Sequence, residues 1–203
     1  MRKLPRLHVI TDEVLQTQFD HVTLARLAFE GGAGAVQLRE KRPRSTRALI
    51  EIAVAARRDD RVVIIDDRTD VAAAAGVGVH VGAEDLPVSV ARRLLGPDAI
   101  VGFSTRTVEG ARAVTDVDYI GVGPVYGTRS KPGLTTPLGL EMLARIVRVS
   151  PVPVIAIGGI TAEHVPEVLA TGAYGVAAIS AIVCAQDPAA ATAKFVEAIE
   201  GAS

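Results

Sequence analysis

The sequence predicts an α/β protein: a (β/α)8 TIM barrel made by one domain that spans residues 1–203. Two observations support this prediction. Eight short runs of apolar, often β-branched residues alternate with longer stretches at helical spacing, and several runs are continuously apolar, as in parallel strands covered on both faces. No linker or shift in composition divides the chain, and a doubly wound sheet usually has fewer strands.

The apolar runs predict strands at 7–11, 35–38, 62–66, 78–81, 100–104, 119–123, 152–157 and 175–180. The stretches that follow them predict helices at 23–30, 44–58, 71–75, 88–95, 108–114, 138–149, 162–170 and 188–199. Glycines at 31–32, 76 and 172 precede strands, where a left-handed residue ends a helix and returns the chain to the barrel. Pro188 suits the first turn of the last helix, because its missing N–H would have no partner there.

Composition argues against several classes of protein. Lys and Arg number 22 and Asp and Glu 23, so the net charge of −1 argues against a nucleic-acid or anionic-membrane binder that acts through bulk charge. The single cysteine, Cys184, excludes an internal disulfide, and its apolar surroundings predict a buried, inert thiol. No apolar run reaches the ~18 residues of a membrane span, and the basic N-terminus lacks the pattern of a signal peptide. We therefore expect a cytoplasmic protein; whether it forms a homo-oligomer is left open.

Polar residues gather after the predicted strands, at the end of the barrel where active sites of this fold lie. Gln37, Arg39 and Lys41 occupy alternate positions from within the second strand to just past its end, and so share one face. Two cations and an amide there suit a phosphate ester, with a solvated charge cluster as the alternative.

Carboxylates follow the next two strands. Asp67 and Asp85 can converge on one Mg²⁺, which takes a few protein oxygens and keeps water and phosphate as its other ligands. The alternative is that they cap the helices that follow, a role that Asp70 and Glu84 fit well.

The remaining candidates lie further along the chain. His80 fits the role of a satisfied core histidine better than that of a metal ligand. Ser104, at the end of the fifth strand, suits either a phosphate oxygen or a helix cap. The long loop at 121–133 is rich in Gly, hydroxyls and cations and predicts a phosphate clamp that closes over substrate. The glycines at 158–159 and Ser180 predict a second phosphate site, formed partly by backbone N–H groups.

These positions carry a resemblance to the thiamine-phosphate synthase family. The resemblance covers nearly the whole chain and rests on seven blocks in order, at 36–41, 65–68, 84–87, 102–105, 121–125, 130–133 and 156–160. It implies an enzyme that joins a pyrimidine diphosphate to a thiazole phosphate, releasing diphosphate and giving thiamine phosphate.

The resemblance also implies roles for individual residues. The pyrimidine diphosphate site would comprise Gln37, Arg39, Lys41, Asp66, Ser104 and Lys131, of which Arg39, Lys41, Ser104 and Lys131 would also serve catalysis. The Mg²⁺ ligands would be Asp67 and Asp85. The thiazole phosphate site would comprise Thr128, Ser130, Gly159, Ile179 and Ser180. This electrostatic set suits a reaction in which diphosphate leaves an electron-rich pyrimidine and the thiazole nitrogen attacks, so no protein nucleophile is needed.

Three positions depart from the family pattern. Asp66 stands where the family usually has Asn, Ala83 where it often has Gln, and Arg106 where it usually has His. Asp can accept a hydrogen bond from the aminopyrimidine but cannot also donate one unless it is protonated. A related thiazole tautomerase is the first alternative, weakened because Arg106 cannot exchange a proton. A non-catalytic phosphate-ligand sensor on the same barrel is the second.

Overall fold

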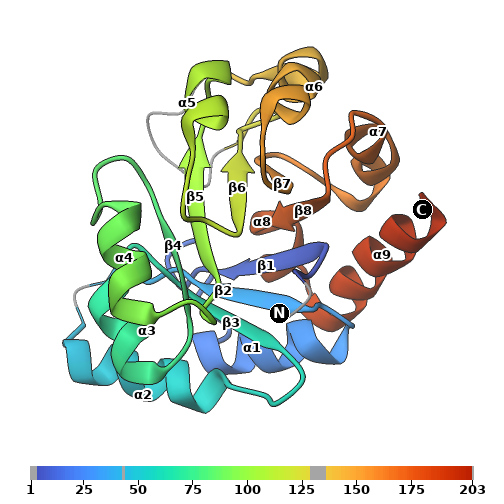
Figure 1. Cartoon of the computed structure of the whole chain (residues 1–203). Coiled ribbons are helices and arrows are strands. Elements are labelled where there is room, and N and C mark those ends of the chain that lie inside the picture. Colours follow the sequence, from blue (N-terminus) through green and yellow to red (C-terminus); the bar gives the residue numbers. More distant parts are fainter. Residues whose placement is uncertain (1–3, 43, 129–135, 203) are drawn as a thin grey trace.

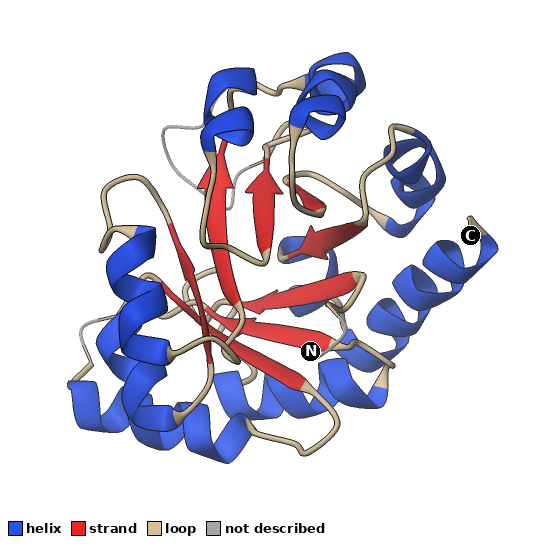
Figure 2. Cartoon of the chain, viewed as in Figure 1, coloured by secondary structure: helices blue, strands red, loops and turns tan. Residues whose placement is uncertain are grey.

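The computed structural model of the chain describes residues 4–42, 44–128 and 136–202. Eight parallel strands close into a barrel, with each strand paired to its neighbours in the chain and β8 paired to β1 (Figure 1). The helices lie outside the ring of strands, as Figure 2 shows. The predicted (β/α)8 barrel is confirmed.

The strands are β1 (Leu7–Thr11), β2 (Ala35–Leu38), β3 (Val62–Asp66), β4 (Gly78–Val81), β5 (Val101–Thr105), β6 (Tyr119–Val122), β7 (Val154–Ile157) and β8 (Gly175–Ala178). The helices are α1 (His21–Glu30), α2 (Thr46–Ala56), α3 (Thr69–Ala75), α4 (Val88–Leu95), α5 (Val108–Ala113), α6 (Gly139–Val149), the 3-10 turn η1 (Ala162–His164), α7 (Val165–Ala170), α8 (Ser180–Val183) and α9 (Pro188–Gly201). None of these described helices is long and apolar enough to cross a membrane.

Side chains along each strand alternate between two buried regions. One region, which includes Val9, Val36 and Val79, packs against the surrounding helices. The other, which includes Ile64 and Ile155, fills the inside of the barrel. Polar side chains at the same inward-facing strand positions therefore point into the barrel. They form part of the site described below.

Several local predictions also hold. Gly32, Gly76 and Gly172 all have positive φ, and Gly76 ends α3 in the left-handed conformation. Pro188 lies in the first turn of α9, where Asp187 caps the helix by accepting from the N–H of Ala190.

The structure corrects other predictions. β7 begins at Val154, two residues later than predicted, after Pro153, which has no N–H for a strand ladder. β8 ends at Ala178, and residues 180–183, which continue the apolar run, form the unpredicted helix α8. The residue after that helix, Cys184, is exposed, so the prediction of a buried thiol is wrong. The buried face of α8 is formed instead by Ile182 and Val183.

Candidate active site

A cavity of about 830 Å³ opens at the carboxyl ends of the strands and is lined by residues from all eight of them. Apolar side chains such as Ile10 and Ile155 line its deeper part. Its polar residues include eight that the sequence singled out: Gln37, Arg39, Asp66, Asp67, Asp85, Ser104, Arg106 and Thr128. A second hollow of about 590 Å³, at the opposite end of the barrel near Pro5 and Arg61, contains none of the described site residues.

Gln37 and Arg39 are held rigidly at the end of β2. Gln37 is buried, and its Nε2 donates to Oδ1 of Asp66 over 2.5 Å. The guanidinium of Arg39 pairs with the buried carboxylate of Asp12 and lies 3.7 Å from Oδ2 of Asp66. Asp12 is itself fixed, because its Oδ1 accepts from the N–H groups of Val14 and Leu15. The guanidinium therefore needs little ordering before it binds an anion.

Lys41 joins this group from the more exposed side. Its Nζ lies 2.6 Å from Oδ2 of Asp67 and 3.7 Å from Oδ2 of Asp66. Burial and the neighbouring charge of Asp67 raise the pKa of Asp66, and Lys41, Arg39 and Gln37 oppose the rise, so that the pKa is about 6. Asp66 therefore holds a proton more readily than an ordinary aspartate does.

Asp67 and Asp85 face each other at the cavity mouth. Asp67 has a left-handed backbone, with φ of 65°, and its N–H donates to the carbonyl of His80 over 2.9 Å. Oδ2 of Asp85 accepts from the N–H of Gly82 over 2.7 Å. Burial raises the pKa of Asp85; the Gly82 hydrogen bond opposes this, and the carboxylate of Asp67 adds to the rise. The two neighbouring carboxylates form an oxygen pair suited to a divalent cation.

The helix-capping alternative is wrong for these carboxylates. The N-cap residues of α3 and α4 are Arg68 and Pro87. Asp70 is not a cap either: it lies in the first turn of α3 and pairs with Arg68. Glu84 precedes Pro87 by three residues and caps no helix.

Ser104 and His80 form a hydrogen-bonded pair inside the mouth. Oγ of Ser104 lies 2.8 Å from Nε2 of His80, whose Nδ1 lies 3.0 Å from the hydroxyl of Tyr119. His80 is thus a satisfied core histidine, as predicted. The cap of α5 is Thr107, so the capping alternative for Ser104 is wrong.

The predicted thiazole phosphate residues lie on the other side of the mouth. Thr128 and Ile179 line the cavity, together with Gly158. Gly159 has φ of 68° and packs so closely that a Cβ there would lie 2.4 Å from the carbonyl oxygen of Gly127. Ser180 is exposed at the start of α8. Ser130 and Lys131 lie outside the described residues.

A model of a known family matches residues 7–182, and its description is thiamine monophosphate synthase. The chain belongs to this family. The matched segment spans the barrel from β1 into α8 and includes every described residue of the cavity mouth discussed above.

Individual members of the synthase family are similar over almost their full length. A thiamine-phosphate synthase of Salinibacter ruber is 42% identical over 98% of this chain and 91% of its own. One of Methanoculleus marisnigri is 43% identical over 97% of this chain and 96% of its own. A solved structure, a thiamine phosphate pyrophosphorylase from Pyrococcus furiosus, is 38% identical with a TM-score of 0.86 and covers 97% and 96% of the two chains.

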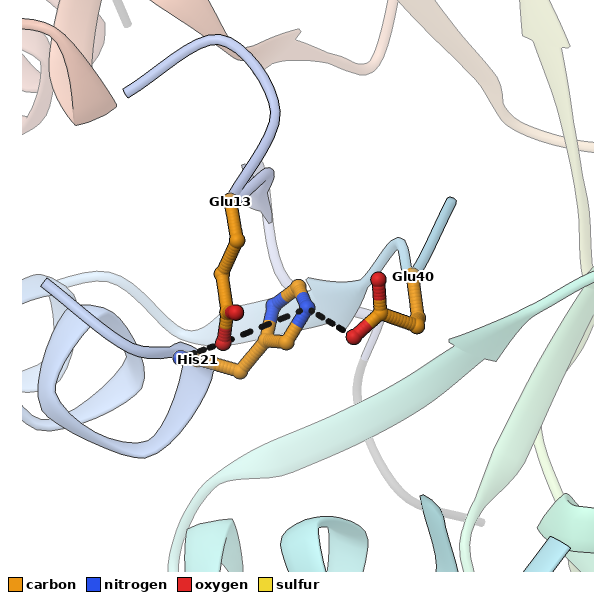
Figure 3. A group of neighbouring side chains, drawn as sticks. All are labelled: Glu13, His21 and Glu40. Carbon is orange, nitrogen blue, oxygen red and sulfur yellow. Dashed lines mark hydrogen bonds and ion pairs between the residues drawn. The ribbon is translucent and has the colours of Figure 1, made fainter. Parts of the chain in front are cut away.

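One cluster near the synthase site escaped the sequence analysis. Glu13, His21 and Glu40 offer ligand atoms within 4.8 Å of one another, and Figure 3 shows the imidazole between the two carboxylates. Nε2 of His21 lies 3.3 Å from Glu40 and 3.7 Å from Glu13. The rule that selected polar residues after strands would have found Glu13, had it been applied to the first strand.

The charges of this cluster are already balanced by arginines. Arg42 and Arg44 pair with Oε2 of Glu13 at 2.9 and 2.5 Å, and Arg44 also pairs with Glu40. Burial lowers the pKa of His21, against the opposing effect of both glutamates. Two glutamates and two arginines sum to zero, so the cluster needs no cation. It forms a buried ion-pair network behind Arg39 and Lys41.

Proposed function

We propose that the chain condenses 4-amino-2-methyl-5-(hydroxymethyl)pyrimidine diphosphate with thiazole phosphate, giving thiamine phosphate and diphosphate. The C–O bond between the pyrimidine methylene and diphosphate breaks, and its electron pair leaves with diphosphate. The thiazole nitrogen then donates its lone pair to the methylene carbon. The chain belongs to a family of thiamine-phosphate synthases, and its phosphorylated small-molecule substrates are those of that family.

The observation that carries this proposal is the convergence of acids and cations at one cavity mouth. Arg39 and Lys41 contact the carboxylates of Asp66 and Asp67, and Asp85 faces Asp67 from the next connection. A group of this composition suits the binding of a diphosphate together with a divalent cation.

We propose Asp67 and Asp85 as the residues that hold Mg²⁺. The fit rests on the structure's two adjacent carboxylates and on the oxygen ligands that this ion prefers. When bound, Mg²⁺ supplies positive charge that stabilises departing diphosphate. Lys41, which now pairs with Asp67, is then free to turn toward the diphosphate.

The pyrimidine diphosphate is proposed to bind across β2, β3 and β5. Arg39, Lys41, Ser104 and Lys131 would contact the diphosphate oxygens, with charge from the cations stabilising the leaving group. Gln37 and Asp66 would recognise the aminopyrimidine. Asp66 would accept from the exocyclic amine in place of the usual Asn, with Gln37 holding its other oxygen.

The thiazole phosphate is proposed to bind on the side of β6 to β8. Thr128 and Ser130 would donate to its phosphate, and the backbone at Gly159, Ile179 and Ser180 would complete the site. Bound there, the thiazole would present its nitrogen to the pyrimidine methylene carbon above the apolar side chains that line the cavity.

Incubation of the protein with both substrates and Mg²⁺ tests this function. We expect thiamine phosphate and diphosphate in equal amounts, and an absence of thiamine phosphate at saturating substrate would reject it. The tautomerase alternative predicts turnover that survives a chelator and releases no diphosphate, while the sensor alternative predicts binding without turnover. The relatives favour neither alternative. One domain over residues 1–203 and a cytoplasmic location stay predictions.

A further inference from the structure

The buried residues beneath Ser104 form a chain of hydrogen bonds that leads from the barrel interior to the cavity mouth. Tyr119, on β6, is 1% exposed, and its hydroxyl lies 3.0 Å from Nδ1 of His80 on β4. Nε2 of the same imidazole lies 2.8 Å from Oγ of Ser104 on β5. Three neighbouring strands thus each contribute one member.

The backbone around the imidazole is built to admit it. Glycines lie beside it on the next two strands: Gly102 on β5 is in register with His80, and Gly121 on β6 is in register with Ser104. A Cβ at Gly102 would lie 2.5 Å from Nδ1 of His80 and 2.2 Å from the ring of Tyr119. A Cβ at Gly121 would lie 3.0 Å from Cε1 of His80. Larger residues at these two positions would therefore collide with the ring.

The buried phenol of Tyr119 determines which group donates in each of these hydrogen bonds. Among the described residues, the structure gives the Tyr119 hydroxyl one hydrogen-bond partner, Nδ1 of His80. Burial raises the pKa of Tyr119, so the hydroxyl keeps its proton. A buried donor left unused costs more than an unused lone pair, so Tyr119 donates and Nδ1 accepts. In a neutral imidazole the proton is then on Nε2, which donates to Oγ of Ser104.

We propose that His80 and Tyr119 are positioning residues that make Ser104 a hydrogen-bond donor toward the diphosphate. With one lone pair of Oγ occupied by Nε2–H, the hydroxyl proton of Ser104 points into the cavity, where an anion can accept it. The reverse direction would leave the phenol proton buried without an acceptor and turn the Ser104 proton inward. This inference rests on the proposed function, because it assumes that the anion beside Ser104 is a diphosphate.

A double-mutant cycle tests this hydrogen-bond relay of Tyr119, His80 and Ser104. Calorimetry measures the affinity of each variant for inorganic diphosphate in the presence of Mg²⁺. Ser104→Ala is expected to weaken diphosphate binding about 10-fold, the scale of one hydrogen bond to a charged group. Tyr119→Phe, which frees the imidazole to take either tautomer, is expected to weaken it about 3- to 10-fold. The double variant is expected to match Ser104→Ala within about 2-fold, because His80 and Tyr119 act only through Ser104.

Tyr174→Phe is the matched control, since its hydroxyl donates to the carbonyl of Leu4 away from the cavity. It is expected to bind diphosphate as the wild type does. In steady-state kinetics Tyr119→Phe is expected to raise the KM of the pyrimidine diphosphate and to leave that of thiazole phosphate unchanged. General damage to the barrel would instead raise both.

A second pair of variants covers the case in which Tyr119→Phe does not fold. His80→Gln keeps an N–H that can reach Ser104, and His80→Leu does not. We expect the first to stay within about 3-fold of wild-type affinity and the second to lose about 10-fold.

Two results would overturn the relay: multiplicative effects in the double variant, or equal affinity of the Gln and Leu variants. A wild type that binds diphosphate yet forms no thiamine phosphate would overturn the proposed function alone. A wild type that does not bind diphosphate would overturn both.

Discussion

Arg39 shows how a single side chain is prepared for binding at the cavity mouth. Its guanidinium pairs with Asp12, which is buried and itself held by two backbone N–H groups. Lys41 is less constrained, with 39% of its side chain exposed and an ion pair to Asp67. A fixed cation loses little conformational entropy on binding an anion, whereas a mobile one can follow it. We therefore expect Arg39 to orient the diphosphate and Lys41 to adapt to it.

The acid pair gives the first prediction at this scale. Asp85→Asn keeps an oxygen for the N–H of Gly82 but removes the charge, and kcat/KM is expected to fall about 10²- to 10³-fold through lost cation binding. The measurement is the initial rate as a function of Mg²⁺ concentration. Asp70→Asn is the control, because Asp70 pairs with Arg68 outside the cavity. Rates within about 3-fold of wild type for Asp85→Asn at all Mg²⁺ concentrations would remove the metal assignment.

His8 gives a prediction about stability. Burial lowers its pKa from 6.5 to about 4, so the folded protein keeps it neutral where the unfolded chain protonates it. A lowered histidine pKa means that stability is lost as the pH falls below 6.5. Between pH 7 and pH 5 this one group is expected to cost about 2 kcal/mol of unfolding free energy.

Urea unfolding of wild type and His8→Gln at both pH values measures this cost. The variant is expected to lose about 2 kcal/mol less than wild type over that interval, whatever its stability at pH 7. An equal loss in both proteins would show that His8 does not titrate differently in the folded state.

At the scale of elements, the ion-pair network behind β2 organises the connection to α2. Glu40 lies between Arg39 and Lys41 in the chain but turns away from the cavity, toward His21 and Arg44. Glu13, from the segment after β1, joins the same network. The network thereby anchors the stretch of chain that carries both cavity cations.

Arg44→Met tests this anchoring role. It leaves Glu40 without its arginine, and the unfolding free energy is expected to drop by about 2 to 3 kcal/mol, less than for a fully broken buried pair because Arg42 still pairs with Glu13. Arg47→Met breaks the exposed pair with Glu51 and is expected to cost less than about 0.5 kcal/mol. In a variant that lacks the carboxylates of both Asp67 and Asp85, chelation is expected to leave the Tm unchanged. A fall in the Tm of that variant on chelation would instead assign a metal to Glu13, His21 and Glu40.

The elements also show what sequence patterns can and cannot predict. The strands at 7–11, 35–38, 62–66 and 78–81 agree with the structure, because apolar runs this short, with polar loops on both sides, favour buried strands over helices. α8 was missed because Ser180 to Val183 continue the apolar run of β8, and four residues are too few to show a helical period. The cluster of Glu13, His21 and Glu40 was missed because Glu40 meets Glu13 and His21 only when β1 and β2 lie side by side.

At the scale of the whole molecule, closure of the barrel is what assembles the site. Gln37, Asp66 and Ser104 come from strands that are separated by helices in the chain, yet they line one cavity. The rule that polar residues after strands gather at one end was enough to select them. It could not give their partners, because the contacts of Arg39 with Asp12 and of Ser104 with His80 depend on strand register and stagger.

The central claim is that the acids from two neighbouring strand ends hold a divalent ion beside a diphosphate. A crystal structure of the protein with Mn²⁺ in place of Mg²⁺ and with inorganic diphosphate tests it most directly, since anomalous scattering locates the ion. We expect one ion bound by the carboxylates of Asp67 and Asp85 and by diphosphate oxygens, with Ser104 within hydrogen-bond distance of the same diphosphate. An ion located elsewhere, or a diphosphate bound with both carboxylates turned away, would contradict it.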